Sequence, residues 1–105
     1  MGREDTISIA DWVDDTFGTK TTPIRAAVRA NQEMSELMTA LLDGTSESKA
    51  REECADVAIV LCMVCRRLGG DLWHEIERKM DINRGRTWAM DGSGCGYHVK
   101  AESTP

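Results

Sequence analysis

The stretch that decides the fold is residues 49–68, KAREECADVAIVLCMVCRRL, which two glycines follow. Polar turn residues precede it and Gly69-Gly70 ends it, so we predict a helix from about Lys49 to Leu68. The part from Val57 to Cys65 is apolar on all sides, which a helix tolerates only where it is buried almost all round. One face of this segment would meet water in a lone small domain, so we expect it to lie at a subunit interface.

Three more helices are predicted around this segment from apolar residues at helical spacing and from capping residues. We expect one from Thr6 to Phe17, one that opens at Thr22-Pro23 and stops at Asp43-Gly44, and one that starts after Asp71 and ends near Arg86 to Trp88. Short connections make successive helices antiparallel neighbours. The expected fold is therefore an all-α, four-helix antiparallel bundle.

The chain is expected to form a single domain over residues 1–105, with a helical core at about 6–88. No segment alternates between apolar and polar residues for long enough to predict a strand. The glycine-rich tail, residues 89–105, is loop by composition, and glycine would let it approach a ligand closely as a lid.

Composition and charge narrow the function classes. Hydrophobic residues make up 41% of the 105 residues and aromatics only 5%, so the core is thin and subunit association is expected. The net charge of -5 argues against duplex nucleic acid as a partner. It does not argue against a nucleotide, which clustered carboxylates bind through divalent cations.

The expected compartment is the cytoplasm. The charged N-terminus lacks the apolar centre of a signal peptide, and the longest apolar run is too short to span a bilayer. The cysteines of the apolar helix suit a reducing environment, where Cys62 and Cys65 act as small apolar residues. A zinc site that joins them to Cys95 and His98 is the less favoured alternative.

Two pairs of acidic residues carry the candidate chemistry. Glu33 and Glu36 are three residues apart on one helix, and Glu53 and Asp56 repeat that spacing on the next. Antiparallel packing brings the pairs opposite each other, where the carboxylates repel one another unless divalent cations lie between them. Oxygen ligands favour magnesium or manganese over zinc.

A structural alternative stays open at this point. Arg29 with Glu33, and Lys49 with Glu53, have the spacing of ordinary ion pairs on a solvated helix face. The chain would then be a non-enzymatic helical oligomerisation module whose acidic face docks a basic partner.

The pattern Glu33-x-x-Glu36, then Glu53-x-x-Asp56, then Lys79-x-x-x-Asn83-x-x-Arg86 resembles the MazG-like all-α NTP pyrophosphatases over roughly residues 6–88. The resemblance implies magnesium-dependent cleavage of a nucleoside triphosphate to a monophosphate and pyrophosphate. It implies that the four acids ligate Mg²⁺, with Mn²⁺ as a substitute, and that Glu36 also activates water. It further implies that Lys79, Asn83 and Arg86 contact phosphate or sugar, and that the chain is a homodimer or homotetramer.

Other substrate contacts are less firmly indicated. The tail resembles that of small phage-type members, some of which act on purine deoxynucleotides (dGTP or dATP). Arg29 and Asn31 depart from the commoner family pattern, and we hypothesise that one of them touches the substrate, although a solvated polar face explains them equally well. The helical spacing of Trp12 and Phe17 favours core packing over base stacking, with Trp12 the better candidate for stacking. His98 would reach phosphate if the tail closed over the site.

Overall fold

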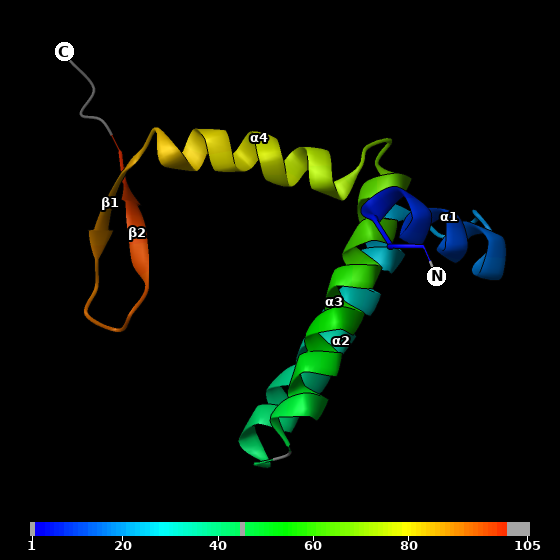
Figure 1. The fold of residues 1–105 in the computed structure, drawn as a ribbon, viewed down its shortest axis with the longest axis horizontal. Coiled ribbons are helices and arrows are strands. Elements are labelled where there is room, and N and C mark those ends of the chain that lie inside the picture. Colours follow the sequence, from blue (N-terminus) through cyan, green and yellow to red (C-terminus); the bar gives the residue numbers. More distant parts are fainter. Residues whose placement is uncertain (1, 45, 101–105) are drawn as a thin grey trace. The chain divides into compact units, whose positions relative to one another are not determined.

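A computed structural model describes residues 2–44 and 46–100 of the chain. Residues 101–105 of the predicted tail and Thr45 of the predicted turn lie outside the described residues. The elements are α1 Thr6–Phe17, α2 Pro23–Leu42, α3 Glu47–Arg67, α4 Leu72–Arg84, β1 Thr87–Met90 and β2 Gly96–Val99 (Figure 1). They form two compact units, one up to His74 and one from Glu75 on. The four predicted helices are confirmed, and the assignment to a single domain stays a prediction.

Side-chain caps explain where the helices of the N-terminal unit begin. Asp5 accepts a hydrogen bond from the backbone N–H of Ser8, whose hydroxyl accepts one from the backbone of Asp5 in return, so α1 opens on a capping box. Thr22 caps α2 in front of Pro23, as predicted. Ser46 caps α3, which therefore begins two residues earlier than the predicted Lys49.

Helices α2 and α3 lie side by side and antiparallel, and α1 packs on α3 (Figure 1). Small residues fill the core of the described part of the chain, where no large side chain is completely buried. The core consists of Ala10, Val13, Ala26, Ala40, Val57 and Cys62. Small side chains at helix contacts allow close approach of the backbones, and this lets polar groups of facing helices meet.

Charged groups attach α1 to the end of α3. Arg66 pairs with Asp11 at 2.9 Å and with Asp14 at 3.1 Å, and Arg67 also pairs with Asp14. Arg67 additionally donates a hydrogen bond to the carbonyl oxygen of Thr19 at 2.7 Å. The Asp14 side chain is only 17% exposed, so these pairs are partly shielded from water and fix the position of α1.

The predicted subunit interface on α3 stays a prediction. Val57 and Cys62 are buried within the chain, whereas Leu61 is exposed and Ile59 and Val64 are half-buried. The apolar run therefore keeps part of its surface available to a second copy.

The C-terminal unit differs from the expected loop. Helix α4 ends at Arg84, before Gly85, and Thr87–Met90 pairs antiparallel with Gly96–Val99. The intervening turn is organised by Asp91, which accepts hydrogen bonds from both the backbone N–H and the hydroxyl of Ser93. The prediction of a helix reaching Arg86 to Trp88 and of a strandless tail was therefore wrong, because two short strands satisfy each other's backbone groups across a tight turn.

No helix within residues 2–44 and 46–100 is both long enough and apolar enough to cross a membrane.

Candidate active site

Three of the four acidic residues converge between α2 and α3. One carboxylate oxygen each from Glu33, Glu53 and Asp56 lies within 4.8 Å of the other two. Glu33 and Glu53 are buried, with 5% and 6% of their surface exposed, and Asp56 is exposed. A cluster with two buried acids is costly unless other charges or cations balance it.

Glu36 lies beside this cluster on the exposed side of α2. Burial and then the neighbouring Glu36 carboxylate raise the pKa of Glu33 above its ordinary value, and Asp56 adds a smaller effect of the same sign. The positive charge of Arg29 opposes these effects. Repulsion from the neighbouring carboxylates therefore contributes to the raised pKa of Glu33.

Each buried acid has a basic partner one turn earlier on its own helix. Arg29 lies 2.8 Å from Glu33, and Lys49 lies 3.2 Å from Glu53. The ion pairs expected from spacing are thus present, and they exist together with the convergence of the acids. The two basic side chains do not balance the four carboxylates, so the acidic cluster keeps an excess of negative charge.

The donor set fits a divalent cation. Glu53 Oε2 is buried and has no hydrogen-bond partner among the described residues, although Oε1 of the same carboxylate binds Lys49. A buried acceptor without a partner costs free energy, which coordination of a cation would remove. The ligands are carboxylate oxygens only, as magnesium and manganese prefer.

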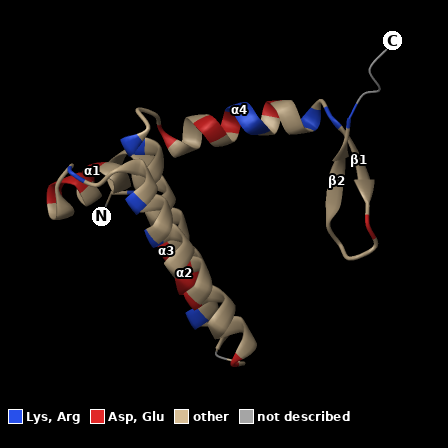
Figure 2. Ribbon diagram, turned by 180° about the vertical axis from the view of Figure 1, so that it is seen from behind, with Lys and Arg blue, Asp and Glu red and all other residues tan. Residues whose placement is uncertain are grey.

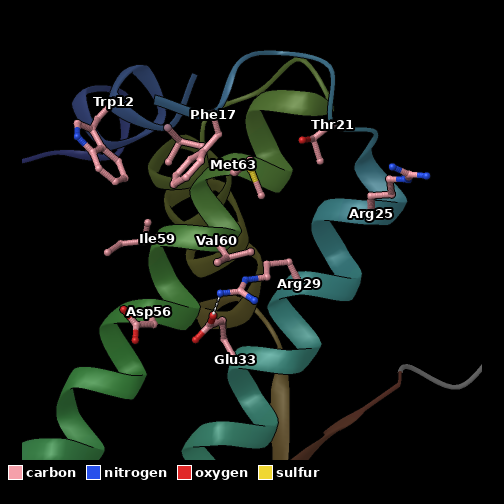
Figure 3. A pocket seen from close by; sticks show the side chains of 11 residues that line it. Trp12, Phe17, Thr21, Arg25, Arg29, Glu33, Asp56, Ile59, Val60 and Met63 are labelled. Carbon is pink, nitrogen blue, oxygen red and sulfur yellow. Dashed lines mark ion pairs between the residues drawn. The ribbon is translucent and has the colours of Figure 1, made fainter. Parts of the chain in front are cut away.

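A cleft of about 540 Å³ opens next to the acids in the N-terminal unit (Figure 3). Glu33 and Asp56 lie at one end of it, and Trp12 and Phe17 lie at the other end. Arg25 and Arg29 of α2 form a basic wall, and Ile59, Val60 and Met63 of α3 form an apolar wall. A single ligand in this cleft would contact the acidic end, the arginine side chains and the aromatic end.

The aromatic pair belongs to this cleft rather than to the core. Trp12 is 55% exposed and Phe17 is 69% exposed, and their rings meet edge to face with centroids 5.7 Å apart. The expectation of core packing for both was therefore wrong, because α1 turns this side of its apolar stripe toward the cleft.

Other predicted residues lie elsewhere. Arg29 lines the cleft, whereas Asn31 is exposed and is not among the residues that line it. Lys79, Asn83 and Arg86 belong to the C-terminal unit. There Asn83 accepts a hydrogen bond from the indole N–H of Trp88 at its carbonyl oxygen, at 2.9 Å.

Arg25 is the cleft residue that the sequence reasoning missed most clearly. Arg25, Arg29 and Glu33 are spaced by four residues and so form one stripe of α2. That spacing was available in the sequence and would have placed Arg25 beside the acids. Thr21 and Met63 also line the cleft, but nothing in their sequence context distinguishes them.

A smaller, more open hollow of about 310 Å³ adjoins the acids on the Glu36 side. Glu36, Glu53 and Lys49 line it together with Ser35, Thr39 and Asp43. The carboxylates therefore separate two openings, one with an apolar and aromatic lining and one that is polar.

These features define a mostly helical protein with a candidate divalent-metal site between two antiparallel helices. Two comparisons with known proteins bear on its family. A dATP/dGTP diphosphohydrolase of Cyanophage S-2L is 38% identical over 53 residues, which are 50% of this chain and 50% of that protein. The chain thus matches about half the length of this curated relative.

The second similarity is to a solved structure, a Cyanophage S-2L MazG-like pyrophosphohydrolase bound to dGDP and three catalytic Mn²⁺ ions per active site. It has a TM-score of 0.68 and 27% identity, and it covers 90% of this chain and 93% of that one. No family model matches the chain. The two similarities confirm the resemblance to the MazG-like NTP pyrophosphatases, and the fold of the chain is similar to that of a MazG-like pyrophosphohydrolase.

Proposed function

We propose that the chain is a magnesium- or manganese-dependent pyrophosphohydrolase that converts a deoxynucleoside triphosphate and water into the monophosphate and pyrophosphate. The observation that carries this proposal is the convergence of Glu33, Glu53 and Asp56 at one end of a basic, aromatic cleft. The names of the two phage relatives support it, since one is a dATP/dGTP diphosphohydrolase and the other holds dGDP and Mn²⁺.

Glu33, Glu36, Glu53 and Asp56 would hold the metal. Divalent cations at these carboxylates would supply charge neutralisation for the polyphosphate and a lowered pKa for the attacking water. Glu36, whose side is open to the polar hollow, is the residue that we assign to orienting this water and accepting its proton.

The basic wall of the cleft would hold the phosphates. Arg29 already binds a carboxylate at 2.8 Å, so its guanidinium has the position and geometry to bind a phosphate oxygen at the same end. Arg25 lies one turn away and extends the positive charge along the cleft. Lys79, Asn83 and Arg86 of the C-terminal unit stay proposed contacts to phosphate or sugar, and Asn31 stays a proposed contact to the base.

Trp12 and Phe17 would receive the base. Aromatic rings that are exposed on one side stack on a nucleobase with about 1–3 kcal/mol each, and stacking is stronger for the larger purine surface. We therefore propose dATP and dGTP as the substrates.

The proposed assembly is a homodimer or homotetramer in the cytoplasm. The chain buries few large apolar side chains by itself and leaves Leu41, Leu42, Leu61 and Leu68 exposed. Cys54, Cys62 and Cys95 are free thiols, which suits a reducing compartment.

Turnover with a panel of deoxynucleotides tests the proposal. Release of pyrophosphate from dGTP or dATP should require Mg²⁺ or Mn²⁺ and should disappear in Glu36→Gln. Glu47→Gln is the matched control, because Glu47 is an exposed acid at the start of α3 outside the cluster. A folded protein that hydrolyses no nucleotide with either metal refutes the proposal and favours the non-enzymatic docking module.

A further inference from the structure

The residues of α2 that line the cleft, and the loop before it, give the cleft an order along its length. Four lining residues follow one another at intervals of four: Thr21, Arg25, Arg29 and Glu33. The last three form one stripe of α2, because residues four apart lie one turn above each other. Glu33 therefore lies at the acidic end of the cleft, and Thr21 lies at the end where Phe17 lies (Figure 3).

The loop that carries Thr21 is held in place by α3. Arg67, the last residue of α3, pairs with Asp14 of α1 and donates a hydrogen bond of 2.7 Å to the carbonyl oxygen of Thr19. Figure 2 shows this basic end of α3 in blue beside the red acidic segments of α1. One arginine thus fixes both the helix that carries Phe17 and the loop that carries Thr21, so this end of the cleft is formed before a ligand binds.

Thr21 supplies an unpaired hydroxyl at the aromatic end of the cleft. The residue is half-buried, and its hydroxyl has no hydrogen-bond partner among residues 2–44 and 46–100. The other polar atoms of the side chains lining this end are the Trp12 indole N–H, which can only donate, and the Met63 sulfur, which accepts weakly. The Thr21 hydroxyl is therefore the group here that both donates and accepts a strong hydrogen bond.

We propose that Thr21 binds the polar edge of a purine that stacks on Trp12 and Phe17, and that its hydroxyl lets one site accept both adenine and guanine. The inference rests on the proposed function, in which the base occupies this end of the cleft. At the same position of the ring, adenine carries an amino group that donates and guanine carries an oxygen that accepts. A hydroxyl rotates to suit either group, whereas a carboxylate or an ammonium group would suit only one of them.

Calorimetric titration of the full chain with dAMP and dGMP in the presence of Mg²⁺ tests the inference, because these proposed products contain no α–β phosphate bond to be cleaved. Thr21→Val keeps the branched shape of the side chain and removes the hydroxyl, so it should weaken the binding of both nucleotides about fivefold. Thr21→Ser keeps the hydroxyl and should bind both within about twofold of the parent. Inorganic pyrophosphate has no base and should bind Thr21→Val as well as it binds the parent.

Thr19→Val is the matched control, because Thr19 belongs to the same loop, is exposed and is not among the residues that line the cleft. This variant should leave both affinities unchanged. Equal weakening in Thr19→Val and Thr21→Val overturns the inference, as does a Thr21→Val protein that binds both nucleotides like the parent. A loss confined to one purine, or a matching loss of pyrophosphate affinity, overturns it as well.

Nucleotide turnover on the same samples keeps this inference distinct from the proposed function. Hydrolysis of dGTP by a parent protein whose affinity for dAMP and dGMP is unaffected by Thr21→Val overturns the inference alone. The expected losses of affinity without hydrolysis of any nucleotide overturn the proposed function alone. A parent protein that binds neither dAMP nor dGMP overturns the inference.

Discussion

Replacing Glu53 by glutamine should remove the stabilisation by divalent metal without unfolding the protein. Glu53 is 6% exposed, and its Oε2 atom has no hydrogen-bond partner among the described residues. Glu53 is therefore the acid best placed to coordinate a cation. Glutamine keeps the shape of the side chain and removes its charge.

The magnitude follows from binding linkage. At a metal concentration about 100 times the Kd, a bound cation stabilises the native protein by about 2.7 kcal/mol. For a chain of 105 residues this corresponds to a rise in Tm of roughly 10–20 °C. If the loss of one ligand weakens metal binding about 100-fold, the stabilisation falls to about 0.4 kcal/mol, or a rise of only about 2–3 °C.

The metal-free variant should melt at the same temperature as the parent or higher. One charge of a repulsive cluster is gone. Lys49 loses one of its two acidic partners, but its side chain is 52% exposed, so the lost ion pair costs less than about 0.5 kcal/mol. Thermal unfolding in EDTA and in magnesium measures both effects.

Glu52→Gln is the matched control, because Glu52 is the neighbouring acid, is 69% exposed and also approaches Lys49. This control should keep the full metal response. A Glu53→Gln protein that gains as much from magnesium as the parent would refute the assignment of Glu53 as a ligand.

Three further predictions concern the acids, α1 and the hairpin. In EDTA, the free energy of unfolding should fall as the pH rises above about 4.5, because the folded protein raises the pKa of Glu33 and so binds more protons than the unfolded chain in that window. Denaturant titrations at several pH values measure this, and Glu33→Gln should flatten the dependence; an unchanged slope would contradict it. Asp14→Asn should lower stability by about 2 kcal/mol and raise KM for dGTP more than it lowers kcat, since two arginines lose their shared partner and α1 carries Trp12. Steady-state kinetics decide this, and a loss confined to kcat would argue against a positioning role for α1. Gly96→Ala should disturb the hairpin, because a Cβ there would lie 2.8 Å from the carbonyl oxygen of Ala89. Backbone NMR shifts should then change in residues 87–99 and not in α2, and an unperturbed hairpin would show that the strand pairing is described wrongly.

The helices of the N-terminal unit could be predicted because their signals are local. Thr22-Pro23 marks the start of α2, and Gly18 marks the end of α1 in the structure as in the sequence. The relation between the acidic pairs also follows from spacing, since residues three apart share a helix face and a short turn makes α2 and α3 antiparallel.

The hairpin could not be predicted in the same way. Its strands have four residues each, and the turn between them, from Asp91 to Cys95, has the composition of an unstructured loop. The stabilising contacts join different elements of structure. Trp88 of β1 contacts His98 of β2, and its indole N–H bonds to the carbonyl oxygen of Asn83 in α4. Pairing of this kind becomes visible only when both strands are placed together.

The aromatic end of the cleft was missed for a related reason. Helical spacing shows that Phe17 lies on the apolar stripe of α1, but it does not show which part of that stripe another helix covers. That coverage depends on the ion pairs of Arg66 and Arg67 with Asp14, which join residues more than fifty positions apart.

The opposite charges of the basic wall and the acidic end of the cleft have a thermodynamic consequence. The arginine wall attracts an anion and the carboxylate end attracts cations, so each ligand improves the site for the other (Figure 3). Reciprocity requires that the factor by which metal tightens nucleotide equals the factor by which nucleotide tightens metal. A fall in nucleotide concentration would thus also lower the apparent affinity for metal. The proposed enzyme would then become less active when little nucleotide remains to be degraded.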